Sequence, residues 1–426
     1  MISSNFSTIN PLRVMAFGVG AFTQGVLHVL KQNGAQVCTY LIRDYAHYSP
    51  SLEGETFLAE VYPNPCKLLR EKEIDFVIPM SIDWILADWA DEFLSLDIPI
   101  FSPIGEGMKL ERDRDFARKL CQKFDIPFPN SYVAKNRLEA ENILNSNPRG
   151  YVIKNPFCSP TSPIHTILCE TVKDTRSWLE RIDYAEGIFL QEYMGHREAG
   201  HIAMVSGGEI YSLVTNQEYK RSFNGNMGIL AGAPLGGLVE RDQEDKYKLA
   251  KELLHPLLPW FREVGFQGPV QVTAIHHEGQ WFVLEYNVRI GVTSGPMILQ
   301  MLENPLEVLW CVVRNQNVPV RFKNNLNFGC SLTLAGYGYP FIQVDGPRLP
   351  IQVLEDLDCD VWWNEVAADS KGHLYTTGHR IADVVAIGPS LEEVLNKAYE
   401  NIRKIRCLSS YYRTDIGQSL WPPGRD

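Results

Sequence analysis

The stretch VLEYNVRIG, residues 283–291, places three polar side chains in a segment that otherwise reads as a buried strand. Side chains of an extended strand alternate between its faces, so Glu285, Asn287 and Arg289 share one face at a repeat of ~6.6 Å. A carboxylate and an amide oxygen at that spacing suit Mg²⁺, which commonly bridges substrate phosphates. Arg289 adds a planar cation for phosphate or carboxylate oxygens. The alternative interpretation is the exposed face of a half-buried hairpin, and the pattern alone leaves both open.

The sequence around this stretch predicts the hairpin that would carry it. GPVQVTAIHH and GQWFVLEYNVR are strand-like runs joined by a tight turn at Glu278 and Gly279. Gln271, on the first of these strands, is a weaker candidate for a metal contact. No Ser/His or Cys/His arrangement for nucleophilic catalysis is evident in the sequence.

The rest of the chain divides into regions with different patterns. RVMAFGVG, TQGVLHVLKQNG and AQVCTYLIR alternate as strand, helix and strand, and IDFVIPM to IPIFSP repeats that rhythm, which predicts an open parallel sheet. Mostly antiparallel strands follow, with one long helix expected over DQEDKYKLAKELLHPLLPWFREV. A smaller closing domain ends with the helix SLEEVLNKAYENIRKIR. The predicted fold class is therefore a multidomain combination of α/β and α+β.

Composition restricts the class of partner. At 426 residues, with roughly 150 residues per domain, about three domains are expected. The net charge of −11 and the lack of a long Lys/Arg block argue against nucleic acid or an anionic membrane as a partner. Nine scattered cysteines with no CxxC pair indicate reduced thiols in a cytoplasmic protein. No run reaches the ~18 apolar residues of a membrane span, and a monomer or homodimer is expected.

Short motifs occur along the chain in the order of a known family. They are RVMAFGVG, IDFVIP, IPIFSP, VIK, LQEYMGHREA, IAMVSGGEIYSL, EYKR, LEYNVRIG and YYRTDIG. Through them the chain resembles the ATP-grasp enzymes, and among these the glycinamide ribonucleotide synthetases, also called phosphoribosylamine–glycine ligases. The resemblance implies an N-terminal parallel-sheet domain (1–108), an ATP-grasp domain (109–325, with a small lobe at about 130–195 and a large lobe at about 196–325) and a C-terminal domain (326–426).

The resemblance makes QEYMGHRE the segment that links the two lobes around a nucleotide. The carbonyl of Glu192 and the amide of Met194, on either side of Tyr193, would meet the adenine edge, and Glu198 would accept from the ribose hydroxyls. Backbone groups can read a planar heterocycle in this way, and a carboxylate can accept from both hydroxyls of a diol.

The resemblance also places three cations on the ATP phosphates: Lys154, Arg114 and Lys220. Each alone is more often a surface charge, but together they would supply the local positive pocket that an acidic protein needs to hold ATP.

Glu285 and Asn287, with Gln271, would hold Mg²⁺, with Mn²⁺ as an alternative ion, and Arg289 would steady the transferred phosphoryl group or the acyl phosphate. The implied reaction phosphorylates a carboxylate with ATP and lets an amine attack the acyl phosphate. Such chemistry needs positioning and charge neutralisation more than a protein nucleophile. The substrates are small molecules.

Three departures from the family bear on turnover and substrate. The loop NPFCSPTSPIHT, residues 155–166, has no glycine and three prolines, which predicts a stiff loop with Ser159, Thr161 and Ser162 as hydroxyl donors. The turn GVGAFTQG replaces a Gly-Gly-Arg-Glu-His run that helps to hold a sugar phosphate, and SIDWIL brings Trp84 close to the presumed amine site. FNGNMGILAGAPLGG and IGVTSGPM replace glycine-rich and acidic loops.

Three interpretations remain from the sequence. The first is an ATP-dependent carboxylate–amine ligase with substrates other than phosphoribosylamine, and the alternative is a true phosphoribosylamine–glycine ligase with diverged loops. The third is a nucleotide-binding protein that has lost catalysis, which the glycine-free loop favours. The joint presence of Glu285, Asn287, Arg289, Lys154 and Glu198 speaks against the third.

Overall fold

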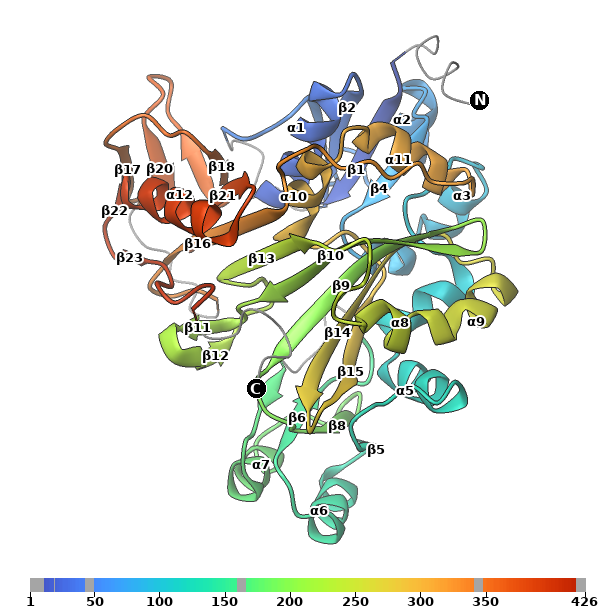
Figure 1. Ribbon diagram of the computed structural model, residues 1–426. Coiled ribbons are helices and arrows are strands. Elements are labelled where there is room, and N and C mark those ends of the chain that lie inside the picture. Colours follow the sequence, from blue (N-terminus) through green and yellow to red (C-terminus); the bar gives the residue numbers. More distant parts are fainter. Residues whose placement is uncertain (1–10, 19, 43–49, 159–165, 341–347, 419–426) are drawn as a thin grey trace.

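An open parallel sheet forms the N-terminal part of the chain in the computed structural model, which describes residues 11–18, 20–42, 50–158, 166–340 and 348–418 (Figure 1). The strand order is β3-β2-β1-β4, and each of these pairings is parallel. The strands are β1 (Arg13–Gly18), β2 (Gln36–Leu41), β3 (Glu55–Leu58) and β4 (Phe76–Pro79), and the helices are α1 (Ala21–Gln32), α2 (Cys66–Glu71) and α3 (Ala90–Leu94).

β1 is buried on both faces, which explains its continuous apolar sequence. Val14 and Ala16 pack with α1 and with two helices from later in the chain, α10 (Ser294–Met301) and α11 (Pro305–Val313). Met15 and Phe17 pack on the opposite face. The strand order reverses between β1 and β4, and open α/β sheets commonly bind ligands at the carboxyl ends of the strands at such a point.

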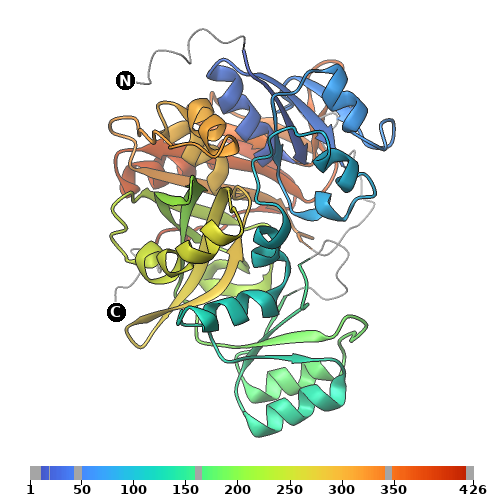
Figure 2. The ribbon, with the colours of Figure 1, turned by 90° about the vertical axis from the view of Figure 1, so that its right-hand side faces the viewer.

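A small lobe projects from the rest of the molecule, as Figure 2 shows most clearly. Its antiparallel sheet has the order β5-β8-β6-β7 and is covered by two helices. The elements are β5 (Ser131–Ala134), α6 (Arg137–Ser146), β6 (Tyr151–Lys154), β7 (Ile167–Leu168), α7 (Val172–Leu179) and β8 (Ile188–Glu192). Two short helices precede it, α4 (Lys109–Arg112) and α5 (Arg114–Lys123). Residues 159–165, which include the predicted hydroxyl donors, lie outside the described residues.

A nine-stranded sheet runs through the centre of the molecule, in the order β15-β14-β9-β10-β13-β16-β21-β18 with β23 beside β16. Its strands are β9 (Glu198–Ser206), β10 (Glu209–Glu218), β13 (Gly236–Arg241), β14 (Gly268–His277), β15 (Gln280–Asn287), β16 (Phe328–Gly336), β18 (Asp360–Trp363), β21 (Arg380–Gly388) and β23 (Ser410–Tyr411). Because β13 pairs with β16, this sheet continues across the expected domain boundary at 325–326.

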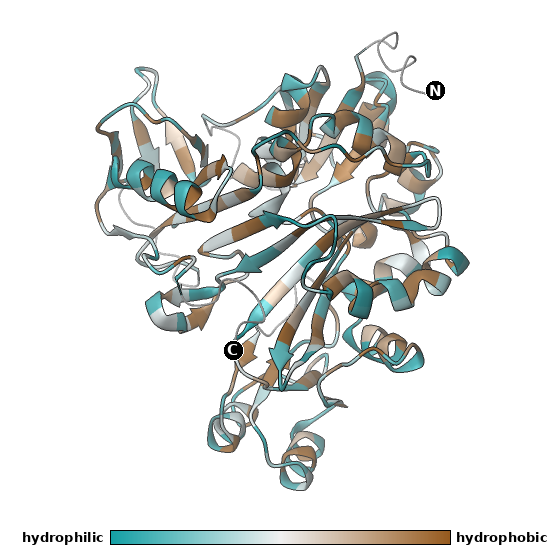
Figure 3. Ribbon diagram, in the orientation of Figure 1, coloured by the Kyte–Doolittle hydropathy of each residue, from teal (hydrophilic) through white to brown (hydrophobic). Residues whose placement is uncertain are grey.

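The C-terminal region adds a second small sheet, β19-β20-β17-β22, and the long helix α12 (Leu391–Arg403). Ser390 caps that helix by accepting from the Glu393 N–H. The strands are β17 (Pro350–Val353), β19 (Val366–Ala368), β20 (Leu374–Thr376) and β22 (Ile405–Cys407). Figure 3 shows apolar residues gathered in the strands between the layers and polar residues on the outer side of α12.

The predicted hairpin of β14 and β15 is confirmed, with positive φ at Glu278 (48°) and Gly279 (82°) in its turn. The single long helix expected after β13 is wrong: α8 (Leu249–Leu253) and α9 (Leu258–Glu263) are separated by a 3₁₀ turn. Pro256 explains the break, because it has no N–H for the helical ladder. Among the described residues, no helix is long and apolar enough to span a membrane.

Candidate functional site

A bulge in β15 sets where its polar face begins. Leu284 has no partner in the register, because the residues on either side of it pair with consecutive residues of β14. Past the bulge the half-buried Glu285, Asn287 and Arg289 alternate with buried residues. Gln271 of β14 lies directly opposite Asn287 and is 3% exposed. The structure therefore brings these four predicted residues to one short stretch of the hairpin and its continuation.

Lys220, which follows β10, binds Glu285. Its Nζ lies 3.1 Å from Glu285 Oε1, 3.6 Å from Glu218 Oε2 and 3.9 Å from Glu198 Oε2. Burial opposes the charge on Lys220, but the three carboxylates outweigh burial and raise the pKa of the ammonium. Lys220 is in turn the main reason that the pKa of the Glu285 carboxyl lies well below its usual range. Both groups are therefore charged at neutral pH. Sequence reasoning missed Glu218, whose only signal is its place two residues before Lys220.

Lys154, the last residue of β6, brings a second cation to Glu285. Its Nζ lies 3.9 Å from Glu285 Oε2 and donates to the carbonyl of the bulged Leu284 at 3.4 Å. Gln191 of β8 donates to the same carbonyl at 3.1 Å. Burial lowers the pKa of Lys154 to about 8, with Glu285 opposing that shift. Lys154 is thus a lysine whose charge depends on the anions that reach it.

Arg289 is held by a buried carboxylate that sequence reasoning missed. Glu111 of α4 is 6% exposed; its Oε1 accepts from Arg289 Nε at 3.0 Å and its Oε2 accepts from the Val288 N–H at 2.6 Å. The other end of the guanidinium donates to Asn287 Oδ1 at 3.3 Å. The signal for Glu111 was the charged run LERDRD, in which only Arg114 was singled out.

Arg114 begins α5 and ties that helix to the segment after β6, since its N–H donates to the Pro156 carbonyl at 3.0 Å. Its positive charge helps to lower the pKa of both Glu285 and Lys154. Its Nε is buried and has no hydrogen-bond partner among the described residues. A buried donor of this kind is costly unless an acceptor is bound to it.

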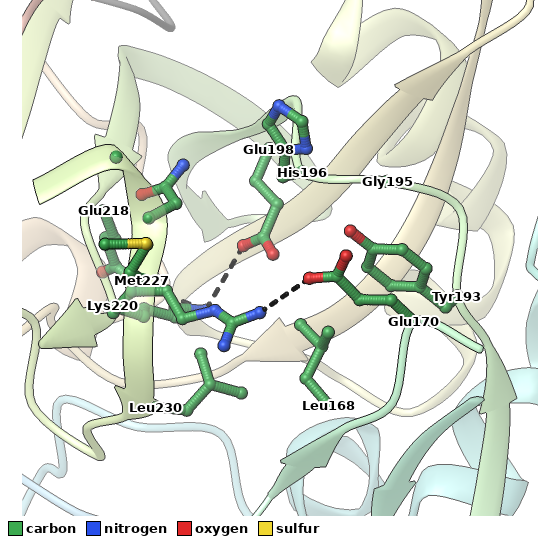
Figure 4. A pocket seen from close by; sticks show the side chains of 13 residues that line it. Leu168, Glu170, Tyr193, Gly195, His196, Glu198, Glu218, Lys220, Met227 and Leu230 are labelled. Atoms are coloured by element: carbon green, nitrogen blue, oxygen red, sulfur yellow. Dashed lines mark hydrogen bonds and ion pairs between the residues drawn. The ribbon is translucent and has the colours of Figure 1, made fainter. Parts of the chain in front are cut away.

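A cavity of about 390 Å³ lies beside the linker between β8 and β9 (Figure 4). Tyr193 and Glu198 line one side of it, and Lys220 lines the other. Further lining comes from the hairpin of β11 (Arg221–Phe223) and β12 (Met227–Leu230). Burial raises the pKa of Glu198, and Lys220 opposes that shift.

The other two predicted linker residues flank the cavity without lining it. Met194 borders a separate hollow of about 200 Å³ next to His276 and His277 at the hairpin tip. The carboxylate of Glu192 binds small-lobe side chains, with Arg149 NH1 at 2.8 Å and Asn130 Nδ2 at 2.7 Å. The roles predicted for Glu192 and Met194 involve their backbone groups and stay predictions.

The sequence places the presumed amine site near the carboxyl ends of β1 and β4. The side chains described there are hydrogen-bonded or packed within the fold. Gln24 is 1% exposed; its Nε2 donates to Thr39 Oγ1 at 3.2 Å and its Oε1 accepts from the Glu53 N–H at 2.7 Å. Trp84 is 5% exposed and packs edge-on against Phe93, with 5.4 Å between the ring centroids. The ring of Trp84 is thus packed in the core, and its closeness to an amine site stays a prediction.

The donor set of the site fits a nucleotide bound with a hard divalent cation. Glu285 is ionised and Asn287 adds an amide oxygen, and Mg²⁺ prefers such ligands. Lys154 and Lys220 lie 3.9 Å and 3.1 Å from the Glu285 carboxylate, and the charge of Arg114 also lowers its pKa, so these three cations could meet phosphate oxygens. The buried Nε of Arg114 supplies a donor with no acceptor among the described residues.

The chain is similar to known proteins in sequence and in structure. Residues 330–419 match the family described as "Phosphoribosylglycinamide synthetase, C domain". A phosphoribosylamine–glycine ligase of Leptospira interrogans is 24% identical over 366 residues, which cover 82% of this chain and 84% of that protein. The crystal structure of phosphoribosylamine–glycine ligase from Thermotoga maritima matches with a TM-score of 0.75 at 21% identity, over 95% of this chain and 100% of that one. A biotin carboxylase from Campylobacter jejuni, solved as a β-γ-ATP complex, matches with a TM-score of 0.69 at 12% identity, over 94% and 92%.

The chain thus has the ATP-grasp fold. Among proteins with this fold it resembles the phosphoribosylamine–glycine ligases.

Proposed function

We propose that this chain joins glycine to phosphoribosylamine in an ATP-dependent reaction. The observation that carries the proposal is the cluster of Glu285, Lys220 and Lys154 beside a cavity that also contains Glu198. The likeness to phosphoribosylamine–glycine ligases over more than four fifths of the chain supports the choice of substrates.

In this proposal the cluster prepares a carboxylate for attack. The γ-phosphoryl group of ATP passes to a carboxylate oxygen of glycine, and ADP leaves. The amine nitrogen of the second substrate then attacks the acyl carbon, phosphate leaves with the C–O bond electrons, and the amine loses a proton. Lys154, Arg114 and Lys220 neutralise the phosphate oxygens, while Arg289, held by Glu111, steadies the carboxylate and the acyl phosphate.

The remaining assignments complete the nucleotide site. Glu285 and Asn287, with Gln271 beside them, would hold Mg²⁺ or Mn²⁺, which when bound neutralises the β- and γ-phosphates. The ribose would meet Glu198, and the adenine edge would meet the backbone of residues 192–194. Lys220 leaves its carboxylate partners for the phosphoryl group, because the incoming anion replaces their charge.

A second candidate is the same ligase with a less anionic amine. Residues 18–24 and 80–84 contain no Lys or Arg and include Asp83. A sugar phosphate carries roughly two negative charges, and burying them without matched donors costs several kcal/mol. Phe22, at the start of α1, packs against the apolar core and adds no donor.

Two measurements test the proposal. A thermal shift with ATP and Mg²⁺ should show stabilisation of about 2.7 kcal/mol when the ligand is at a hundred times its dissociation constant. No shift at millimolar nucleotide would reject the nucleotide site. ADP release is then measured over a panel of amino acids and amines, with product mass as confirmation. Glycinamide ribonucleotide formed faster than every other product supports the first candidate, and faster turnover of another amine supports the second.

A further inference from the structure

The segment YYRTDIG near the C-terminus lies against the β11–β12 hairpin, and a buried arginine makes the central contact. Arg413 is 1% exposed and forms a two-point ion pair with Asp415, with Nε to Oδ1 at 2.8 Å and NH2 to Oδ2 at 2.7 Å. Its NH1 donates to the Arg221 carbonyl at 3.1 Å and its NH2 donates to Asn226 Oδ1 at 3.0 Å. Its guanidinium also lies 5.1 Å from the ring centroid of Tyr219.

These contacts hold Lys220 from both sides along the chain. Tyr219 precedes Lys220 and stacks on Arg413, while the Arg221 carbonyl that follows it accepts from Arg413. The Tyr219 hydroxyl in turn accepts from the Gly417 N–H at 2.9 Å. The backbone that carries the Lys220 side chain is therefore fixed by residues almost two hundred positions away in sequence.

The same segment also holds the turn of the hairpin. Asn224 Oδ1 accepts from the Thr414 N–H at 3.0 Å and Asn224 Nδ2 donates to Thr414 Oγ1 at 2.6 Å. The Gly225 N–H donates to Asp415 Oδ2 at 2.9 Å. Gly225 and Asn226 line the nucleotide cavity. A two-stranded hairpin is marginally stable by itself, so its place over the cavity depends on these contacts.

A charged contact reaches the hairpin from the opposite side. Arg221 NH2 lies 3.2 Å from Glu170 Oε1, which belongs to the small lobe just after β7. Both residues line the cavity, and Figure 4 labels Glu170 there. The hairpin thus lies between the small lobe and the C-terminal segment, but Arg221 is partly exposed and Arg413 is fully buried, so the C-terminal contact is the firmer one.

We propose that Arg413, together with Asp415, is a positioning residue that holds Lys220 against Glu285 and keeps the β11–β12 hairpin over the nucleotide cavity. The inference rests on the proposed function for the role of the cavity. In this proposal the C-terminal region contributes to phosphoryl transfer, because its residues hold Lys220 and the hairpin in place.

The test compares Arg413→Met with the natural protein in the absence and in the presence of ATP. Without nucleotide, amide hydrogen exchange across residues 221–230 should be at least tenfold faster in the variant. With nucleotide, the KM for ATP should rise at least tenfold.

Arg380→Met is the matched control from the same region. Arg380 is 8% exposed, pairs with Asp383 at 2.7 Å and lies 5.7 Å from the ring centroid of Tyr339. Its loss should lower the melting temperature and leave exchange at residues 221–230 as in the natural protein. Where Arg413→Met does not fold, Asn226→Ala replaces it, because it removes one hairpin acceptor and leaves the ion pair with Asp415 intact.

Natural exchange at residues 221–230 and a natural KM for ATP in Arg413→Met or Asn226→Ala would overturn the proposal and leave Arg413 a structural residue. Failure of the natural protein to bind ATP would reject the proposed function. The exchange experiment needs no nucleotide, so it still decides whether Arg413 holds the hairpin.

Discussion

The polar side chains of the cluster around Glu285 and those at the carboxyl ends of β1 and β4 are engaged in different ways. Around Glu285, cations from several segments converge on carboxylates, and Arg114 keeps a buried Nε without an acceptor among the described residues. At β1 and β4, Gln24 is bonded to Thr39 of β2 and to the Glu53 N–H, and Trp84 is packed in the core. Charged side chains that pair with one another can exchange those partners for a charged ligand. Side chains that are hydrogen-bonded or packed inside the core cannot do so without disturbing the fold. We therefore place the proposed chemistry at the cluster and expect little contribution to it from Gln24 and Trp84.

The largest effect on activity is expected from Glu285→Gln, because Lys220 and Lys154 both contact the Glu285 carboxylate. kcat should fall by about 10²–10³, because the change removes the charge at the proposed metal position. The dissociation constant for ATP should change by less than about tenfold, since the linker and Glu198 are untouched. Steady-state kinetics and calorimetric titration measure the two quantities.

Glu278→Gln is the control for this change, because it lies at the tip of the same hairpin with its side chain 86% exposed. It should behave as the natural protein does. Equal losses of kcat and ATP binding in Glu285→Gln would mean that Glu285 is structural.

Glu111→Gln tests whether the cluster depends on a buried support. Arg289 would lose its carboxylate while the side-chain shape is kept, so kcat should fall by about tenfold to a hundredfold through lost orientation. The free energy of unfolding should fall by about 2 kcal/mol in urea denaturation. Glu106→Gln, at an exposed position in the turn before α4, is the control. Unchanged kcat in Glu111→Gln would remove Arg289 from the proposed chemistry.

Lys154 should make the binding of ATP depend on pH. Its pKa is about 8 in the folded protein, below the ~10.4 of a free lysine, so above pH 8 ATP must bind together with a proton. The dissociation constant for ATP should rise up to about tenfold between pH 8 and 9.

The same shift predicts the sign of the stability change. Between about pH 8 and 10.4 the unfolded chain binds the proton more tightly than the folded one, so this group makes the free energy of unfolding rise with pH. In Lys154→Arg the pH effect on ATP binding should disappear, because arginine stays charged. A pH effect that persists in this variant would assign it to another group.

The smallest effect on activity is expected from Trp84→Phe, which tests the region at the carboxyl ends of β1 and β4. Its indole lies in the core, and its Nε1 has no hydrogen-bond partner among the described residues. The KM for the amine should therefore change by less than about twofold, with a stability loss of about 1 kcal/mol from the lost volume. Amine kinetics measured beside the melting temperature test this expectation. A large change in amine KM at unchanged stability would place Trp84 at the substrate site.

Local patterns in the sequence were enough to predict several features of the structure. The period-two alternation of residues 285–290 predicted which side chains share a face, and the turn at Glu278 and Gly279 predicted the hairpin, because both depend on neighbouring residues. The strand and helix rhythm predicted the parallel sheet. The order of motifs indicated the ATP-grasp fold, which the comparisons confirm.

Tertiary structure alone decided how those elements support one another. The bulge at Leu284, the carboxylate of Glu111 beside Arg289 and the grip of Arg413 on the hairpin all join segments distant in the chain. Strand register and buried ion pairs depend on which surfaces meet when the core closes, and the residues alone carry no local mark of that choice. The sequence by itself determined which residue types are available for the proposed chemistry. Packing determined which of them lie together at the candidate site and which are buried in the core.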